Sequence, residues 1–326
     1  MSKKNLVEFK NLKVYFHTEE GTVKAVNDVS FNVREGETIG IVGESGCGKS
    51  VTSMALMKLI PTPPGEYAGG DILFDGESVF AKSEDEMRGI RGNKVSMIFQ
   101  EPMTSLNPVF TVGDQIGEVF RLHQGKDKSQ ARKDSIEMLK LVGIPRADEI
   151  VDAYPHELSG GMRQRVMIAM ALSCNPKVLI ADEPTTALDV TIQAQILDLM
   201  RGLKKKTGTS IMLITHDLGV IAEMADYVVV MYSGKIVEEA PVIELFTNPM
   251  HPYTVGLLKS KPMLNKESDR LYSIPGQVPN PINRPEVCYF SDRCDKAKEG
   301  CTKEQPELIE VKPGHKVSCF LYQGVK

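Results

Sequence analysis

The segment Gly43–Ser50 constrains this chain more than any other, because its residues fit the pattern G-x-x-x-x-G-K-[ST]. The apolar run Thr38–Val42 before it predicts a buried strand, and we expect a helix to begin near Lys49. Glycines let such a loop curl until several backbone N–H groups converge on phosphate oxygens at the positive end of the helix. The sequence therefore predicts a phosphate site whose members are Gly43, Glu44, Ser45, Gly46, Cys47, Gly48, Lys49, Ser50 and Thr52.

Two residues of this loop and two distant carboxylates have specific expected roles. Lys49 would pair with the β and γ phosphates of a nucleotide, and Ser50 would hold Mg²⁺. Asp182 and Glu183 follow the apolar run Val178–Ala181, at a strand end where open parallel sheets place ligand chemistry. Asp182 suits an outer-shell contact to Mg²⁺, and Glu183 is the candidate that aligns or deprotonates an attacking water. An acidic pair at a strand end is often only a solvated edge, but with Lys49 and Ser50 it completes the groups needed to transfer a phosphoryl group to water.

Composition excludes several other classes of protein. Basic and acidic side chains number 39 and 43, for a net charge of −4, so the chain lacks the basic excess of a dedicated nucleic-acid binder. No run approaches the roughly 18 apolar residues of a membrane span, and the N-terminus reaches Glu8 before an apolar signal core forms. We therefore expect a cytoplasmic chain that does not cross a bilayer and whose cysteines are reduced.

The chain is predicted to contain two units. Strand and helix signals alternate over residues 1–248, as in an α/β domain, and Val178–Ala181 and Ile211–Ile214 predict parallel strands covered on both faces. Nine of the 19 prolines and four of the six cysteines fall in the last 78 positions, so residues 249–326 are predicted to form a C-terminal extension. Hairpins are expected at two glycine turns, Asp75-Gly76 and Ser233-Gly234.

A helical layer is predicted within the first unit, from about residue 112 to residue 173. Ser129 is a plausible helix cap there, and Ile136, Leu139 and Val142 recur at helical spacing, which places them on one buried face.

The segment Leu158–Arg165 offers a second anion site. Its residues read Leu-Ser-Gly-Gly-Met-Arg-Gln-Arg and precede a helical run. Ser159 can cap that helix, while Gly160 and Gly161 let bare backbone approach an anion. A helix start carries about half a positive charge, which supplies only part of a phosphate site.

This segment is similar to the signature of ABC-type ATPases, and it lies between the phosphate loop and Asp182 as in that family. The resemblance implies a P-loop α/β core with an antiparallel β subdomain and a helical subdomain. It also implies that ATP is sandwiched between the phosphate loop of one subunit and the signature of a second, so that hydrolysis requires a dimer.

Further residues acquire expected roles from the same resemblance. Gln100 matches the glutamine that contacts Mg²⁺ and the water and senses a membrane partner. Ala187-Leu188-Asp189 matches the loop by which two nucleotide-binding subunits touch, and His216 matches the histidine that contacts the γ-phosphate. Phe16 aligns best with the aromatic residue that stacks on adenine, with Tyr15 second, although aromatic residues on strands are usually core.

Longer segments narrow the resemblance. Phe99–Pro108 and Tyr154–Met162 resemble the ATP-binding subunits of bacterial dipeptide and oligopeptide importers, a group that includes nickel importers. Asn248–Thr254 and Ile274–Pro279 resemble the C-terminal extension of that group. His251, between two prolines, is expected to be a structural loop residue rather than a metal ligand.

The resemblance also implies partners and a location. Two transmembrane permease subunits would contain the transport path, and an extracellular binding protein would select the peptide. The second ATPase subunit would be a paralogue or an identical chain, at the cytoplasmic face of the membrane. The coupling surface is expected near Gln100 and the helical region 112–173. The sequence leaves open whether the cargo is a dipeptide, an oligopeptide or nickel.

Four cysteines in the extension, Cys288, Cys294, Cys301 and Cys319, are spaced C-x5-C-x6-C-x17-C. A proline-rich segment of this size cannot bury much core and needs a staple. Cysteine-only ligation is typical of iron–sulfur clusters, and the spacing is wider than that of structural zinc knuckles. We expect a [4Fe–4S] cluster, with zinc or unligated thiols as the alternatives, and either a structural or a sensory role.

Two other functions compete with import. A regulatory ABC ATPase would gate a partner without transport, but such proteins commonly fuse two ATPase units, and this chain has one set of motifs. An ATPase associated with nucleic acid would need a basic balance and a recognisable reading module, and the sequence has neither.

Overall fold

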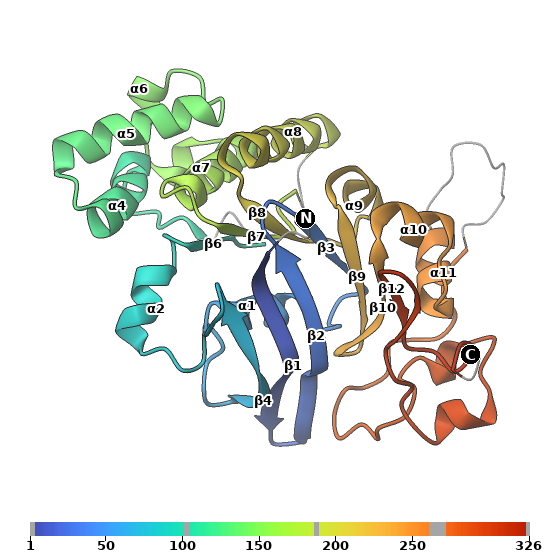
Figure 1. The fold of residues 1–326 in the computed structure, drawn as a ribbon. Coiled ribbons are helices and arrows are strands. Elements are labelled where there is room, and N and C mark those ends of the chain that lie inside the picture. Colours follow the sequence, from blue (N-terminus) through green and yellow to red (C-terminus); the bar gives the residue numbers. More distant parts are fainter. Residues whose placement is uncertain (1–3, 101–104, 186–188, 261–271, 324–326) are drawn as a thin grey trace. The chain divides into compact units, whose positions relative to one another are not determined.

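The computed structural model describes residues 4–100, 105–185, 189–260 and 272–323, which form two compact units (Figure 1). The phosphate-loop unit contains the ranges 5–33, 38–80 and 214–326. The helical unit contains the ranges 1–4, 34–37 and 81–213. The phosphate loop and the C-terminal extension therefore belong to the same unit.

An antiparallel sheet forms one layer of the phosphate-loop unit, with the strand order β2-β1-β4-β5. Its strands are β1 (Asn5–Thr18), β2 (Gly21–Arg34), β4 (Gly65–Phe74) and β5 (Glu77–Ser78). Phe9 of β1 lies opposite Ile72 of β4 and stacks on Phe31 of β2 at a ring distance of 4.3 Å. The predicted hairpin at Asp75-Gly76 is confirmed, because both residues have the positive φ that a tight primed turn requires.

A second set of strands in this unit has the order β11-β12-β10-β9-β3. β3 pairs in parallel with β9, and β9 pairs antiparallel with β10 across the predicted turn Ser233-Gly234. Every residue of β3 is buried, as its apolar sequence predicted. The strands are β3 (Thr38–Val42), β9 (Tyr227–Tyr232), β10 (Lys235–Pro241), β11 (Ile309–Lys312) and β12 (His315–Val317), and the helices are α1 (Lys49–Leu56), α9 (Leu218–Met224), α10 (Val242–Thr247) and α11 (Pro252–Lys259).

The helical unit contains the strands in the order β8-β7-β6. β6 and β7 are parallel, with Ile98 opposite Ala181, as predicted for the apolar run Val178–Ala181. The strands are β6 (Val95–Ile98), β7 (Val178–Asp182) and β8 (Ser210–Ile214), and the helices are α2 (Glu84–Ile90), α4 (Val112–Gln124), α5 (Lys128–Leu141), α6 (Ala147–Ile150), α7 (Gly160–Leu172) and α8 (Val190–Thr207). Across the described ranges, no helix combines the length and apolar character needed to cross a bilayer.

Helices α4 to α7 occupy the stretch that the sequence predicted to be helical, and Ile136, Leu139 and Val142 are buried there. The predicted cap at Ser129 is wrong. α5 begins at Lys128, and the Asp127 carboxylate accepts a hydrogen bond from the Gln130 N–H at 2.9 Å. A carboxylate at this position satisfies a free amide and also carries the charge that the helix dipole favours, so the helix starts two residues earlier than predicted.

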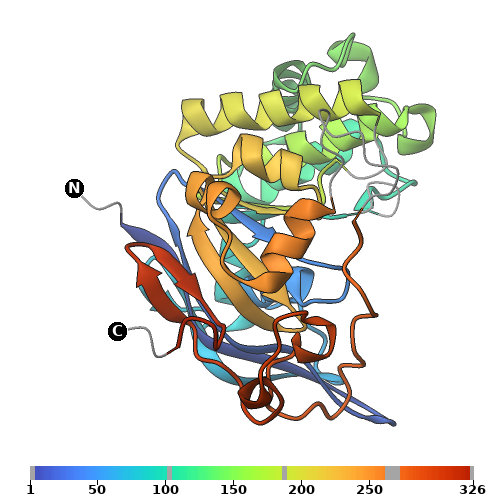
Figure 2. The same ribbon diagram turned by 90° about the vertical axis from the view of Figure 1, so that its right-hand side faces the viewer.

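The described part of the C-terminal extension is mostly irregular in secondary structure (Figure 2). It pairs with strands of the same unit at several points. Ile282 forms an antiparallel bridge with Val23, and the Glu286 carboxylate pairs with Lys24 at 2.6 Å. β12 pairs with β10, which adds the hairpin β12–β11 to the second set of strands. The extension has little hydrophobic core of its own, so these long-range pairings fix its conformation.

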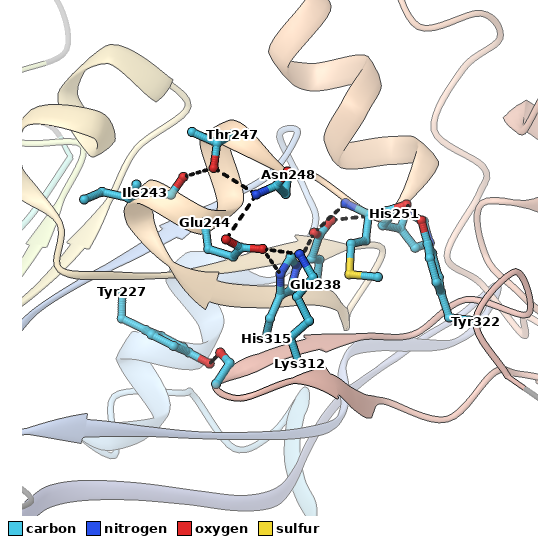
Figure 3. Close-up of polar contacts among 12 residues, drawn as sticks. Tyr227, Glu238, Ile243, Glu244, Thr247, Asn248, His251, Lys312, His315 and Tyr322 are labelled. Atoms are coloured by element: carbon cyan, nitrogen blue, oxygen red, sulfur yellow. Dashed lines mark hydrogen bonds and ion pairs between the residues drawn. The ribbon is translucent and has the colours of Figure 1, made fainter. Parts of the chain in front are cut away.

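A buried polar network fixes the start of the extension (Figure 3). The side chains of Glu238 on β10 and His315 on β12 are fully buried, and they lie 2.7 Å apart. The Glu238 carboxylate also accepts the backbone N–H groups of Met250 and His251 at 2.7 and 2.8 Å. A buried carboxylate needs such partners, so removing either side chain would leave an uncompensated polar group.

Candidate functional site

The phosphate loop has a backbone that only glycine allows at two points. Gly43 and Gly48 have φ values of 154° and 98°. A Cβ at Gly43 would lie 2.1 Å from the Met231 carbonyl oxygen, and one at Gly48 would lie 2.3 Å from the Ala25 carbonyl oxygen. The loop joins the end of β3 to the start of α1 at Lys49, as the sequence predicted. Its amides therefore precede a helix N-terminus, the usual place for an anion.

Lys49 is nearly buried and crosses the loop. Its Nζ donates to the carbonyl oxygens of Gly43 at 2.7 Å and Glu44 at 3.0 Å. Cys47 is buried beside it, and burial raises the pKa of the Cys47 thiol, so this group stays protonated. Two backbone carbonyl oxygens of the loop thus hold the Lys49 side chain against it.

Other predicted members of the site lie on the first turns of α1 and on β1. The Thr52 hydroxyl donates to the Gly48 carbonyl oxygen at 2.9 Å and is fully buried, whereas Ser50 is partly exposed. On β1, Phe16 lies opposite Gly65 and is partly exposed, while the Tyr15 hydroxyl donates to Asn27 at 3.0 Å. Of the two aromatic candidates, Tyr15 already has a hydrogen-bond partner within the fold, the buried side-chain amide of Asn27.

His216 lies two residues after β8 and its side chain is exposed. The next residue, Asp217, caps α9 by accepting the Gly219 N–H at 2.8 Å. The strand end and this helix cap thus fix the backbone on both sides of His216.

In the helical unit, the ends of two parallel strands bring Gln100 and Glu183 together. Gln100 follows β6 by two residues and Glu183 follows β7 by one, and the Gln100 amide donates to the Glu183 carboxylate at 3.2 Å. Asp182, the last residue of β7, is buried. Glu183 has a φ of 48°, an uncommon left-handed conformation that turns the chain sharply after the strand. The sequence predicted these three residues, and the parallel register explains why two of them meet.

The signature segment forms the start of α7, as predicted. The Ser159 hydroxyl accepts the Met162 N–H at 3.3 Å. A Cβ at Gly160 would meet no atom within 4 Å, whereas one at Gly161 would lie 3.2 Å from Ile192. The helix start therefore presents open backbone at Gly160, and the packing of α7 on α8 requires a small residue at Gly161.

Two further contacts position this segment. Asp189 caps α8 by accepting the Ile192 N–H at 2.9 Å, while Ala187 and Leu188 of the same motif lie outside the described residues. The Gln164 amide donates to the Pro184 carbonyl oxygen at 2.6 Å, which ties α7 to the chain just after Glu183. The sequence showed Gln164 only as part of the signature, and its partner could not be found from spacing.

The four cysteines of the extension line one small cavity of about 10 Å³, and none of them is in a disulfide. Burial raises the pKa of Cys288 to about 11 and raises the pKa of Cys294 and Cys319, so these thiols are protonated. In the described part of the chain, no three Cys, His, Asp or Glu side chains are arranged to hold a metal ion. The donor type suits an iron–sulfur cluster. The space holds about one water, so the four side chains would have to move apart to admit a cluster.

Comparisons with known proteins agree with this geometry. Residues 26–186 match the ABC transporter family, and residues 237–301 match the family described as the oligopeptide/dipeptide transporter C-terminal region. The chain is 54% identical to the oligopeptide transport ATP-binding protein AppD of Bacillus subtilis, over 98% of this chain and 97% of AppD. It is 51% identical to the dipeptide transport ATP-binding protein DppD of the same organism, over 97% and 94%.

A solved structure of the ATP-binding cassette MJ0796, dimeric and bound to ADP and Pi, matches with a TM-score of 0.65 at 28% identity. It covers 72% of this chain and 98% of that chain. The α/β fold with its antiparallel and mixed sheets is therefore that of an ABC-type ATPase. With relatives matched over nearly its whole length, the chain belongs to the ATP-binding subunits of oligopeptide and dipeptide ABC transporters.

Proposed function

We propose that this chain binds and hydrolyses ATP to energise the import of dipeptides or oligopeptides. The observation that supports this proposal is that α1 begins directly after the phosphate loop and α7 begins at Ser159, which gives the chain two helix starts suited to an anion. Each offers backbone amides and a helix N-terminus, and each is completed by a second subunit bearing the other.

The phosphate loop would hold the triphosphate through its amides and Lys49. We assign Mg²⁺ to the Ser50 hydroxyl and to Gln100, with Asp182 in its outer shell. These are the oxygen donors that a small hard cation prefers. The metal would neutralise charge that develops on the phosphate oxygens. Phe16, partly exposed on β1, is the proposed adenine-stacking residue.

Hydrolysis would depend on Glu183 as the group that aligns or deprotonates the water. Its contact with Gln100 supports this role, because a carboxylate held by an amide has a fixed direction. His216 is the proposed contact to the γ-phosphate.

A second ATPase subunit would supply the partner surface, through Ser159, Gly160 and Gly161 facing its phosphate loop and Asp189 at the subunit contact. The open space at Gly160 supports this arrangement. The similar cassette MJ0796 was solved as a dimer. We propose a paralogous partner, with an identical chain as the alternative.

Two permease subunits would dock on the helical unit, at the cytoplasmic face of the membrane, and an extracellular binding protein would deliver the peptide. A groove of about 570 Å³ supports this site, with the exposed Phe110 in its lining and Val109 beside it. Apolar side chains that are half or more exposed beside a groove are typical of a protein contact. The groove is lined by Ser105, Asn107, Phe110, Asp114, Gln115, Glu118, Arg121 and Met170.

Isolation from detergent-solubilised membranes tests the import function directly. The tagged chain should co-purify with two membrane-embedded permeases and a second ATPase subunit. Purification with ribosomes or nucleic acid in place of permeases would contradict import, and a soluble partner alone would favour a regulatory ATPase.

We propose that residues 249–326 act as a distinct extension of the ATPase at 1–248, and that the four cysteines ligate a [4Fe–4S] cluster. Their convergence on one cavity supports the assignment. Protein purified without oxygen should contain iron and acid-labile sulfide in equal amounts, with visible absorbance that Cys301→Ser removes. Stoichiometric zinc, or six thiols that all react when the protein is unfolded without releasing iron, would refute the cluster.

A further inference from the structure

Glu44, the second residue of the phosphate loop, is held by two side chains of the C-terminal extension. The Arg293 guanidinium binds both of its carboxylate oxygens, with Nη1 at 2.6 Å and Nη2 at 3.0 Å. The Tyr253 hydroxyl accepts the Glu44 backbone N–H at 2.8 Å. All three residues belong to the phosphate-loop unit, although 249 positions separate Glu44 from Arg293 in the sequence.

Arg293 is itself fixed on every side. Its side chain is only 4% exposed, against 27% for Glu44. Its Nε donates to the Pro275 carbonyl oxygen at 2.9 Å, and Nη1 also reaches the Tyr232 hydroxyl at 3.4 Å. A bidentate guanidinium–carboxylate pair with a buried cation has a defined geometry and weak screening by salt. The pair therefore fixes the direction of the Glu44 side chain.

Tyr253 is fixed through His251, which belongs to the polar network shown in Figure 3. Glu238 binds the amides of Met250 and His251, and the His251 ring accepts the Tyr253 N–H at 3.1 Å. Burial raises the pKa of the Tyr253 hydroxyl, so it remains neutral beside the loop. This chain of contacts leads from the buried Glu238 to the backbone of the phosphate loop.

Glu44 in turn shapes the loop. Its carbonyl oxygen accepts the Lys49 ammonium at 3.0 Å and the Cys47 N–H at 3.3 Å. A displaced Glu44 would move the two groups that the loop offers to phosphate, its amides and its lysine. A Glu44 carboxylate without Arg293 would also bring an uncompensated negative charge close to a triphosphate.

We propose that Arg293 is a positioning residue for the phosphate loop, and that the C-terminal extension sets the affinity for ATP through Glu44. The inference rests on the proposed function of the loop as the triphosphate site. It gives the extension a role in nucleotide binding that is carried by side chains other than its cysteines.

The test is MgATP binding at equilibrium to the full-length chain, with Glu183→Gln present in every variant to prevent turnover. Arg293→Met should weaken binding about tenfold, as expected for the loss of a charge-assisted pair. Arg293→Lys, which keeps the charge but loses the bidentate geometry, should weaken it by a smaller factor. Adding Glu44→Gln to Arg293→Met should restore the affinity to that of Glu44→Gln alone, because the unpaired carboxylate is then gone. A purely structural role for Arg293 would not give this rescue.

Arg284→Met is the matched control. Arg284 lies in the same extension and donates to the Ser233 hydroxyl and the Tyr289 carbonyl oxygen, neither of which is in the phosphate loop. This variant should bind MgATP within about twofold of the parent. Equal affinity of the Arg293 and Arg284 variants, or no rescue by Glu44→Gln, would overturn the inference.

Lys49→Ala separates this inference from the proposed function. If Lys49→Ala abolishes binding while both Arg293 variants bind normally, only the role of the extension fails. If Lys49→Ala binds MgATP normally, the loop is not the triphosphate site and the proposed function fails. If Arg293→Met does not fold, Arg293→Lys is compared with Arg284→Lys instead. Weaker MgATP binding by Arg293→Lys alone would support the inference, and equal binding by the two variants would overturn it.

Discussion

Glu183 combines an unusual backbone with a specific side-chain contact. A non-glycine residue with a φ of 48° costs about 1–2 kcal/mol relative to the right-handed conformation. Backbone strain of this kind persists where the surrounding structure fixes it, and it gathers at functional sites. Here it directs the carboxylate toward Gln100, which supports the proposed role of Glu183 in aligning water.

Glu183→Gln should reduce the rate of ATP hydrolysis at least about 100-fold, because an amide cannot take a proton from water. The affinity for MgATP should change little, since the side-chain size is kept. Phosphate release and equilibrium binding measure the two effects. Glu149→Gln, at an exposed position in the same unit, should leave both unchanged. Undiminished hydrolysis by Glu183→Gln would show that another group activates the water.

His251 is a second residue of interest, because its buried environment should make the stability of the fold depend on pH. Burial lowers its pKa from 6.5 to about 4, against a smaller opposing effect of the Glu238 carboxylate. Its ring accepts the Tyr253 N–H, so the neutral form is the one that the fold requires. The unfolded chain binds a proton below pH 6.5 and the folded chain only below about 4, so the free energy of unfolding falls as the pH drops between these values.

Urea unfolding at pH 7 and pH 5 measures this effect. The parent chain should lose about 2 kcal/mol more than His251→Asn on going to the lower pH, at 1.36 kcal/mol per pKa unit. Asparagine keeps an acceptor for the Tyr253 N–H but does not titrate, so any cost of its smaller size is independent of pH. An identical pH dependence in the two proteins would rule out His251 as the titrating group.

At the scale of elements, the start of α7 does two things at once. Ser159 caps the helix, Gly160 leaves its backbone open, and Gly161 makes room for Ile192 of α8. Packing against Ile192 therefore explains the glycine at position 161. In the described structure, no packing contact explains the glycine at position 160. The proposed contact with a second subunit would explain it.

Gly160→Ala should raise the free energy of unfolding by about 0.5 kcal/mol, because alanine restricts the unfolded chain and no atom obstructs its methyl group. It should nevertheless lower ATP hydrolysis, since the methyl group covers amides meant for the partner's phosphate. Gly161→Ala, matched to it, should destabilise the fold because its methyl group meets Ile192. Thermal melts with turnover assays distinguish the two. Full activity of Gly160→Ala would argue against a phosphate contact at this position.

For the whole molecule, the proposed division of anion-binding groups between a phosphate loop and a signature helix would make association part of catalysis. Neither group alone neutralises a triphosphate, because a helix start carries only about half a charge. A dimer would complete two sites at once, as a closed symmetric or pseudo-symmetric assembly does.

Turnover per chain should therefore rise with chain concentration in the presence of MgATP, and should fall toward zero on dilution. Sedimentation at the same concentrations should show the dimer appearing with the activity, most clearly in Glu183→Gln, which traps bound ATP. If a paralogue is the natural partner, adding it should raise turnover at a fixed concentration of this chain. Constant turnover by a strict monomer would contradict the shared site.

The sequence by itself determined the parts of this protein that depend on neighbouring residues. The loop Gly43–Ser50, the strand before it with the helix after it, and the cap at Ser159 follow from local sterics and periodicity, and all three are present as predicted. Local signals failed where two candidates were close together, as at α5, where Asp127 rather than Ser129 forms the cap.

Only the tertiary structure decided which distant residues meet. The parallel register of β6 and β7 brings Gln100 to Glu183, and the path of the C-terminal extension brings Arg293 to Glu44 and gathers four cysteines around one cavity. The spacing of the cysteines indicated that they would gather, but no spacing encodes the other two contacts, because they depend on the course of the whole chain and on the burial of charges that are favourable only once they are paired.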